Sequence, residues 1–164
     1  MNTGPRALQW WRPHTTFLLS VGLTVIVIAL VIAYAFATFR PTRQVKVASG
    51  VYNLWVADTD TARIKGLSGV SHLPPGGGLF MDFQADDTWG IWMKDMKIPL
   101  DIVWLNKAKQ VVYIVKDVSP NLGTSKIFQP SQPARYVLEL PQGTVDAAGI
   151  KMGGIAQFSG GSAG

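Results

Sequence analysis

Residues 100–116, LDIVWLNKAKQVVYIVK, carry the strongest local structural signal in the chain. Two runs within this stretch, 101–105 and 110–116, are rich in β-branched and aromatic side chains, which favour strands. The polar segment 106–109 between them has the composition of a short connection. These residues therefore predict a β-hairpin, and with it a β-rich domain.

The stretch that leads into this hairpin, TWGIWMKDMKIPLD at residues 88–101, mixes apolar and charged side chains at high density. Trp and Met favour the interior, whereas Lys and Asp favour water unless they are paired. Pro99 prevents an uninterrupted helix through the stretch. We therefore expect it to lie where the core meets solvent, which is a suitable position for contact with a ligand.

The remaining residues of the domain predict further short strands joined by loops. The expected strands are 45–47, 51–57, 79–83, 135–140 and 155–158, the expected short helices are 61–65 and 144–148, and the Pro- and Gly-rich loops are 67–78 and 119–133. No predicted helix is long enough to cover a sheet face as a crossover. The fold class predicted is mainly β, a compact antiparallel barrel-like or sandwich-like domain with one or two short helices.

Residues 17–39 predict a single N-terminal transmembrane helix, because these 23 residues carry no charge and show no polar stripe. A cleaved signal peptide is the main alternative, but its apolar core usually spans only about 7–15 residues. The expected organisation is a short tail at 1–16, the span at 17–39, a linker at 40–44, the β-rich domain at 45–158 and a disordered tail at 159–164. Basic residues stand on both sides of the span, so the charge rule is close to a tie. A short tail before a first span favours an extracytoplasmic domain.

The net charge of +5 comes from the regions that flank the span. Residues 1–46 hold five basic and no acidic side chains, whereas the chain from Val47 onward holds ten of each. The domain is therefore formally neutral, and no basic run interleaved with aromatic residues is present in it. We expect the lipid bilayer as a partner through residues 17–39, an envelope glycan or a protein as a further partner, and no nucleic acid.

Several motifs in order resemble the domain-of-unknown-function family 192. They are Arg63-x-x-Gly66-Leu67, Gly78-Leu79-Phe80-x-x-Phe83, Trp92-Met93-Lys94-x-x-x-Ile98-Pro99-Leu100-Asp101-Ile102, Tyr136–Leu140 with Gly143, and Gly149-Ile150-x-x-Gly153. The resemblance covers about residues 45–158 and implies a small β-rich domain, often exported or membrane-anchored in prokaryotes, with no established activity. The chain departs from the family pattern at Asp95-Met96, Gly78 and Gly154, so a polar site of the relatives would be altered here.

Two carboxylates, Asp95 and Asp101, are the candidate catalytic acid and base, with Lys94 as electrostatic stabiliser and Asp82 or Glu139 as a further acid. The alternative is structural: Asp101 would hold the turn after Pro99, and Glu139 would pair with Lys94 or Arg63. We favour this alternative, because spacing alone does not show that the acids converge.

Candidate ligand-binding residues are Trp92, Lys94, Asp101, Gly77, Gly78 and Glu139. The indole of Trp92 offers a flat apolar face for a sugar or another flat ligand, although such aromatic residues are more often core. Residues 76–78 are three glycines that resemble a phosphate cradle but lack the Lys-Ser/Thr that follows one, so they more readily serve a tight turn.

No cofactor or metal is expected. The chain has no cysteine, His14 precedes the apolar span, and His72 stands alone in a loop, so neither a soft-metal site nor a histidine-based hydrolytic site is predicted. Two functions remain. The preferred one is a membrane-anchored, extracytoplasmic, non-catalytic binding or assembly module of unknown ligand. The alternative is an envelope-associated hydrolase or lyase that uses Asp101 and Asp95.

Overall fold

The computed structural model describes residues 12–38 and 40–159 and divides the chain into two compact units, Met1–Phe39 and Arg40–Gly164. The first unit contains one long helix, α1 (Arg12–Thr38). Within it, Phe17–Ala35 is long and apolar enough to cross a membrane by length and composition. The expected disordered tail lies outside the described residues, apart from Ser159.

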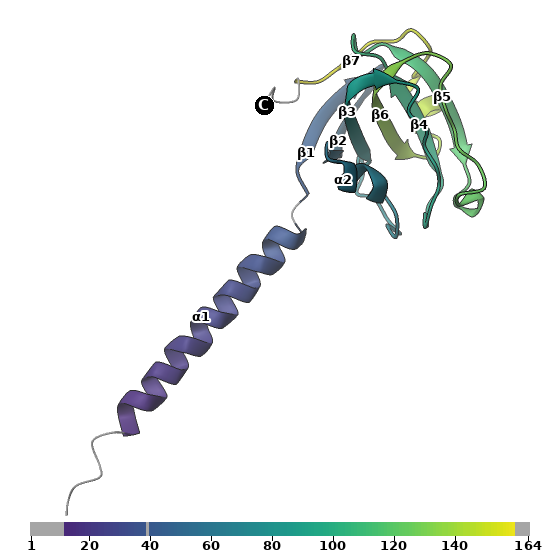
Figure 1. Cartoon of the computed structure of the whole chain (residues 1–164). Coiled ribbons are helices and arrows are strands. Elements are labelled where there is room, and N and C mark those ends of the chain that lie inside the picture. Colours follow the sequence, from purple (N-terminus) through teal and green to yellow (C-terminus); the bar gives the residue numbers. More distant parts are fainter. Residues whose placement is uncertain (1–11, 39, 160–164) are drawn as a thin grey trace, which may run out of the picture. The chain divides into compact units, whose positions relative to one another are not determined.

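The second unit is a β domain with short helices, as the sequence predicts (Figure 1). Its elements are β1 (Thr42–Val47), β2 (Gly50–Ala57), α2 (Asp60–Lys65), β3 (Leu79–Asp87), β4 (Leu100–Leu105), β5 (Val111–Val118), the 3₁₀ turn η1 (Pro120–Leu122), β6 (Ala134–Pro141), α3 (Thr144–Ala148) and β7 (Ala156–Gln157). β1 begins three residues before the predicted domain start, because residues 42–44 already pair with Trp55, Leu54 and Asn53 of β2. The first three residues of β1 thus fall within the segment 40–44 that the sequence predicts as a linker.

The seven strands form one curled half-barrel sheet in the order β5-β4-β6-β3-β2-β1-β7 (Figure 1). All pairs are antiparallel except β2 and β3, which run parallel with Trp55 opposite Leu79. The connection between these two strands holds α2 and the loop 66–78, and a connection of this length lets the chain return to the same end of the sheet. The prediction of an antiparallel domain is thus correct for five of the six neighbouring pairs.

The two strands at the ends of the sheet order, β5 and β7, are joined by backbone contacts near one end of each strand. Gln110 forms a bridge with Ile155, and the backbone N–H of Ala156 donates to the Lys109 carbonyl at 2.9 Å. The Val111 N–H donates to the Gly154 carbonyl at 2.8 Å. These bonds satisfy backbone groups that an open edge would expose.

The sheet buries apolar side chains on both faces. The inner cluster includes Phe80, Tyr136 and Phe158, whose rings pack at centroid distances of 4.9 to 5.5 Å. The outer cluster includes Trp104 and Met93, both fully buried. All six residues of β4 are buried, because loops cover the outer face of the sheet at this strand.

Candidate functional site

A single glutamate interrupts the apolar outer face of the sheet. Glu139 lies in β6, and its register partners are Leu79 of β3 and Ile102 of β4. Residues opposite each other in neighbouring strands share a face, so Glu139 points to the outer side together with these two apolar residues. Its side chain is only 4% exposed.

The carboxyl group of this glutamate has no polar partner in the described part of the chain. No hydrogen bond or ion pair joins the Glu139 side chain to another described residue, and its Oε2 atom is buried without a partner. The sequence-based alternative of a pair with Lys94 or Arg63 is therefore not formed. A buried unpaired polar group costs folding free energy, so Glu139 calls for an explanation beyond stability.

A pocket of about 210 Å³ opens over Glu139. Its walls come from α2 and the turn after it, from β3, and from the segment between β3 and β4. We call this space the Glu139 pocket. Its lining residues are Arg63, Ile64, Lys65, Gly66, Leu67, Ser68, Met81, Phe83, Gly90, Ile91, Trp92, Lys94, Met96 and Glu139.

Two glycines let the chain approach Glu139 closely. Gly66 ends α2 with a φ of +49°, and a Cβ there would lie 3.5 Å from the Met81 methyl carbon and 3.9 Å from Glu139 Oε2. A Cβ on Gly78 would lie 2.4 Å from the Glu139 carbonyl oxygen, which no side chain tolerates. Gly78 thus serves the packing of β3 against β6. The phosphate-cradle interpretation of residues 76–78 finds no support in this geometry, because neither Gly77 nor Gly78 lines the pocket.

Burial changes the acid–base behaviour of this carboxyl group. Desolvation raises the pKa of Glu139 from 4.5 to about 8, because the low-dielectric surroundings disfavour the charged form. Glu139 is therefore mostly protonated at neutral pH. A carboxylic acid in this state donates one hydrogen bond and still accepts others.

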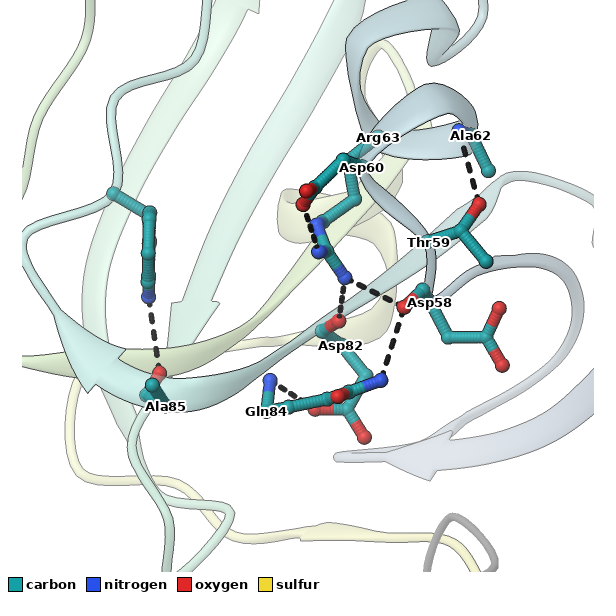
Figure 2. A network of polar contacts seen from close by, with 9 residues as sticks. Asp58, Thr59, Asp60, Ala62, Arg63, Asp82, Gln84 and Ala85 are labelled. Atoms are coloured by element: carbon teal, nitrogen blue, oxygen red, sulfur yellow. Dashed lines mark hydrogen bonds and ion pairs between the residues drawn. The ribbon is translucent and has the colours of Figure 1, made fainter. Parts of the chain in front are cut away.

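Three basic side chains line the same pocket. Arg63 is held by a polar network in which its guanidinium donates to the carbonyls of Asp58 and Asp82 and pairs with the Asp60 carboxylate (Figure 2). Within the described residues, the side chains of Lys65 and Lys94 form no ion pair or hydrogen bond. These two lysines are therefore free to meet a ligand at the pocket.

Aromatic packing fixes one wall of the pocket. Phe83 stacks on Trp89 with ring centroids 4.4 Å apart, and the Trp89 indole N–H donates to the Ala85 carbonyl at 3.0 Å. The Trp89 carbonyl in turn accepts from the buried Trp104 indole at 2.9 Å. The segment 89–96 is thereby tied to the core. Trp92, also on the pocket, is 41% exposed and is not a core residue.

The predicted site residues separate into two groups. Trp92, Lys94 and Glu139 come together at the pocket. Asp95 is exposed and has a φ of +54°, and its carbonyl accepts from the Gly69 N–H at 2.9 Å, although the residue does not line the pocket. Asp95 therefore takes part in the turn of this segment.

Asp101 lies on the other face of the sheet. It is opposite Leu140 in the register, it is fully buried, and its carboxylate accepts from the N–H of Asp117 at 3.0 Å and of Val145 at 2.8 Å. These bonds are structural, but they go to β5 and to the start of α3 and not to the turn after Pro99 that the alternative interpretation expected. Asp101 and Glu139 point to opposite faces, so they do not form one pair of catalytic carboxylates.

Sequence reasoning missed the apolar wall of the pocket. Met81, Phe83, Leu67 and Ile91 look like ordinary core residues, and no local pattern distinguishes a core side chain that borders a cavity. Asp82, a further candidate acid, is buried and pairs with Arg135 at 3.4 Å outside the pocket. Within residues 12–38 and 40–159, no group of three or more His, Cys, Asp and Glu side chains is placed to hold a metal ion.

Comparison with known proteins identifies the family. The model of the DUF192 family, described as Uncharacterized ACR, matches residues 43–158. The chain therefore belongs to this family, as its motifs indicate. A search of curated proteins found none that matches.

Two crystal structures share the fold. The first is a Sinorhizobium meliloti 1021 protein described as a "putative transcription regulator", with a TM-score of 0.68 and 23% identity over 73% of this chain and 95% of that one. The second is a protein of unknown function from Novosphingobium aromaticivorans DSM 12444, with a TM-score of 0.65 and 25% identity over 72% of this chain and 84% of that one. They place the β domain in a known fold.

Proposed function

We propose that this chain is a membrane-anchored, extracytoplasmic, non-catalytic binding module whose ligand occupies the Glu139 pocket. The observation that carries the proposal is the buried, unpaired Glu139 carboxyl group on the wall of a cavity whose lining is largely apolar and whose other charged side chains are basic. Binding sites for small molecules commonly combine apolar walls with a few polar groups that fix orientation. A ligand that supplies the missing hydrogen-bond partner would offset the cost of burying Glu139.

The chemistry of α1 supports the anchor. Its apolar side chains lie on all sides, and the hydroxyls of Ser20 and Thr24 donate to the carbonyls of Phe17 and Ser20 at 2.7 and 2.9 Å. Such bonds satisfy polar side chains within the helix itself, as a hydrocarbon environment requires. Only residues 39–41 separate α1 from β1, so an anchored domain would act near the bilayer surface.

The proposed site is tested by a ligand screen followed by the substitution Trp92→Ala. The screen uses the full chain in lipid nanodiscs. Thermal unfolding is followed with glycans, lipids, nucleotides and metal ions, because a ligand that binds only the folded state raises the transition temperature. For any compound that does so, Trp92→Ala is expected to weaken binding at least fivefold. The fold should persist, since the indole is 41% exposed.

The matched control is Ile155→Ala, which removes an exposed apolar side chain that does not line the pocket. It should leave binding unchanged. A ligand whose affinity falls with Ile155→Ala and not with Trp92→Ala would place the site elsewhere. Global unfolding of the Trp92→Ala chain would contradict a binding role for Trp92, because the indole would then be needed for folding despite its exposure.

The orientation of the domain is tested with a single cysteine. Because the native chain has no cysteine, Lys107→Cys in the exposed connection 106–109 gives one labelling site. A membrane-impermeant maleimide added to intact cells, or to spheroplasts where an outer membrane is present, should label this variant. Labelling only after lysis would contradict an extracytoplasmic domain.

A second candidate function is an envelope-associated hydrolase or lyase, and one observation favours it. Glu139 keeps its proton at neutral pH, as a general acid must. The acid would then be Glu139 rather than Asp101 or Asp95. Of the residues that line the pocket, Glu139 is the only carboxylic acid, so a partner base is missing from this set. Chemical conversion of a bound compound that Glu139→Gln abolishes would establish this alternative.

A further inference from the structure

We propose that the Glu139 pocket takes a small apolar molecule that ends in an oxygen acceptor, and that the Glu139 carboxyl group donates a hydrogen bond to this oxygen. The inference rests on the proposed binding function and names the chemical class of the ligand. Its starting point is the Oε2 atom of Glu139, which is buried without a partner on the pocket wall.

The apolar body of the ligand follows from the walls. The pocket is bordered by side chains of Leu67, Met81, Phe83, Ile91 and Met96, which gain most from contact with carbon. Its volume of about 210 Å³ lies below the roughly 300–1,000 Å³ that is usual for the sites of drug-sized ligands. This space suits one ring with a short substituent rather than an oligosaccharide.

The choice of an acceptor follows from the charges that face the pocket. α2 contributes Arg63 and Lys65, and the segment before β4 contributes Lys94. The residues opposite Glu139 in the neighbouring strands, Leu79 and Ile102, are apolar. All the basic groups repel a cationic ligand. The raised pKa of Glu139 supports the same choice, because a protonated carboxyl group is a donor.

Three molecules with one carbon skeleton separate the alternatives. Acetophenone has an oxygen acceptor, ethylbenzene has no polar group, and 1-phenylethylamine carries a positive charge. The full chain is placed in lipid nanodiscs with ¹³C-methyl-labelled methionine. Two of its five methionines, Met81 and Met96, line the pocket, whereas the exposed Met152 does not, so their methyl resonances report binding at the site and Met152 serves as the internal control.

Acetophenone is expected to bind tightest at pH 6.5 and to shift the Met81 and Met96 resonances alone. Its affinity should fall about tenfold by pH 9, because ionisation with a pKa of about 8 removes the donor. Glu139→Gln keeps a donor and should bind without this pH dependence. Glu139→Leu keeps a similar volume without a donor and should bind acetophenone about fivefold more weakly, with ethylbenzene unaffected.

Distinct outcomes overturn the ligand class and the binding function. If Glu139→Leu binds acetophenone as tightly as the native chain, or if 1-phenylethylamine binds best, the donated hydrogen bond is wrong while the pocket remains a binding site. If none of the three molecules shifts the Met81 and Met96 resonances, the ligand class is overturned; the proposed binding function is overturned only if the thermal-unfolding screen also finds no ligand.

Discussion

Two buried carboxyl groups on neighbouring strands of one sheet have opposite surroundings. Asp101 of β4 points to the inner face and accepts two backbone N–H groups, which hold β5 and α3 in place. Glu139 of β6 points to the outer face and has no partner among the described residues. The first is a satisfied structural acid, whereas the second retains unused hydrogen-bonding capacity beside a cavity. Burial alone therefore does not distinguish these two acids, whereas the number of hydrogen bonds that each carboxyl group accepts does.

The largest expected effect is a pH dependence of stability that comes from Glu139. Its folded pKa of about 8 lies above the ordinary value of 4.5, so between these pH values the unfolded chain releases a proton that the folded chain keeps. The unfolding free energy of the native chain should therefore fall as the pH rises through this window. At about 1.4 kcal/mol per pH unit the loss reaches about 5 kcal/mol.

Glu139→Gln removes this titration and should flatten the curve. Urea unfolding of the β domain in the full chain, followed by tryptophan fluorescence from pH 5 to pH 9, gives the difference between native and variant. Asp146→Asn, at an exposed carboxylate, is the control and should run parallel to the native curve. Parallel curves for the native and Glu139→Gln chains would contradict the difference described between Asp101 and Glu139, because the pKa of Glu139 would then not be raised by folding.

Asp101→Asn should destabilise the domain by about 3 kcal/mol. The amide offers one acceptor oxygen where two backbone N–H groups, those of Asp117 and Val145, now share a carboxylate. Asp95→Asn is the matched control within the same motif. Its side chain is exposed, and Asn tolerates the positive φ at this position, so a change within about 0.5 kcal/mol is expected. If equilibrium denaturation shows that Asp101→Asn and Asp95→Asn lower the free energy of unfolding equally, the structural role of Asp101 is contradicted.

Thr59→Ala gives the smallest effect and acts on the pocket from a distance. The Thr59 hydroxyl accepts from the Ala62 N–H at 3.2 Å and caps α2, which supplies one pocket wall. Loss of this cap should cost about 1 kcal/mol. Hydrogen exchange should rise in α2 and remain unchanged in β4. Unchanged exchange in α2 would show that the helix does not depend on its cap.

The fold was predictable largely because its signals are local. The hairpin of β4 and β5, the cap and terminating glycine of α2, and the Pro- and Gly-rich loops can all be read from neighbouring residues. The parallel pairing of β2 with β3 could not be read, since it depends on where the chain returns after residues 58–78. No local pattern encodes that choice.

The site was only partly predictable, for a related reason. Trp92, Lys94 and Glu139 were candidates because polar and aromatic residues stand out in a sequence. Asp95 and Asp101 stood out equally, and only the sheet register shows that Asp101 faces away from Glu139. Met81 and Phe83, which form part of the pocket wall, cannot be told from other core residues in the sequence. Candidate chemistry is visible in a sequence, whereas convergence in space is not.

The short pairing of β1 with β7 has a consequence for the order of folding. Lys46 and Gln157 are partners although they lie 111 positions apart in the sequence, and Val47 pairs with Ala156. During synthesis, residues near the start of the domain must therefore remain incompletely paired until residues 156–157 have emerged. Contacts this distant in sequence slow folding, because loop closure precedes the gain from pairing. We expect truncation before residue 155 to leave the Val45 edge of the sheet open to association with other chains.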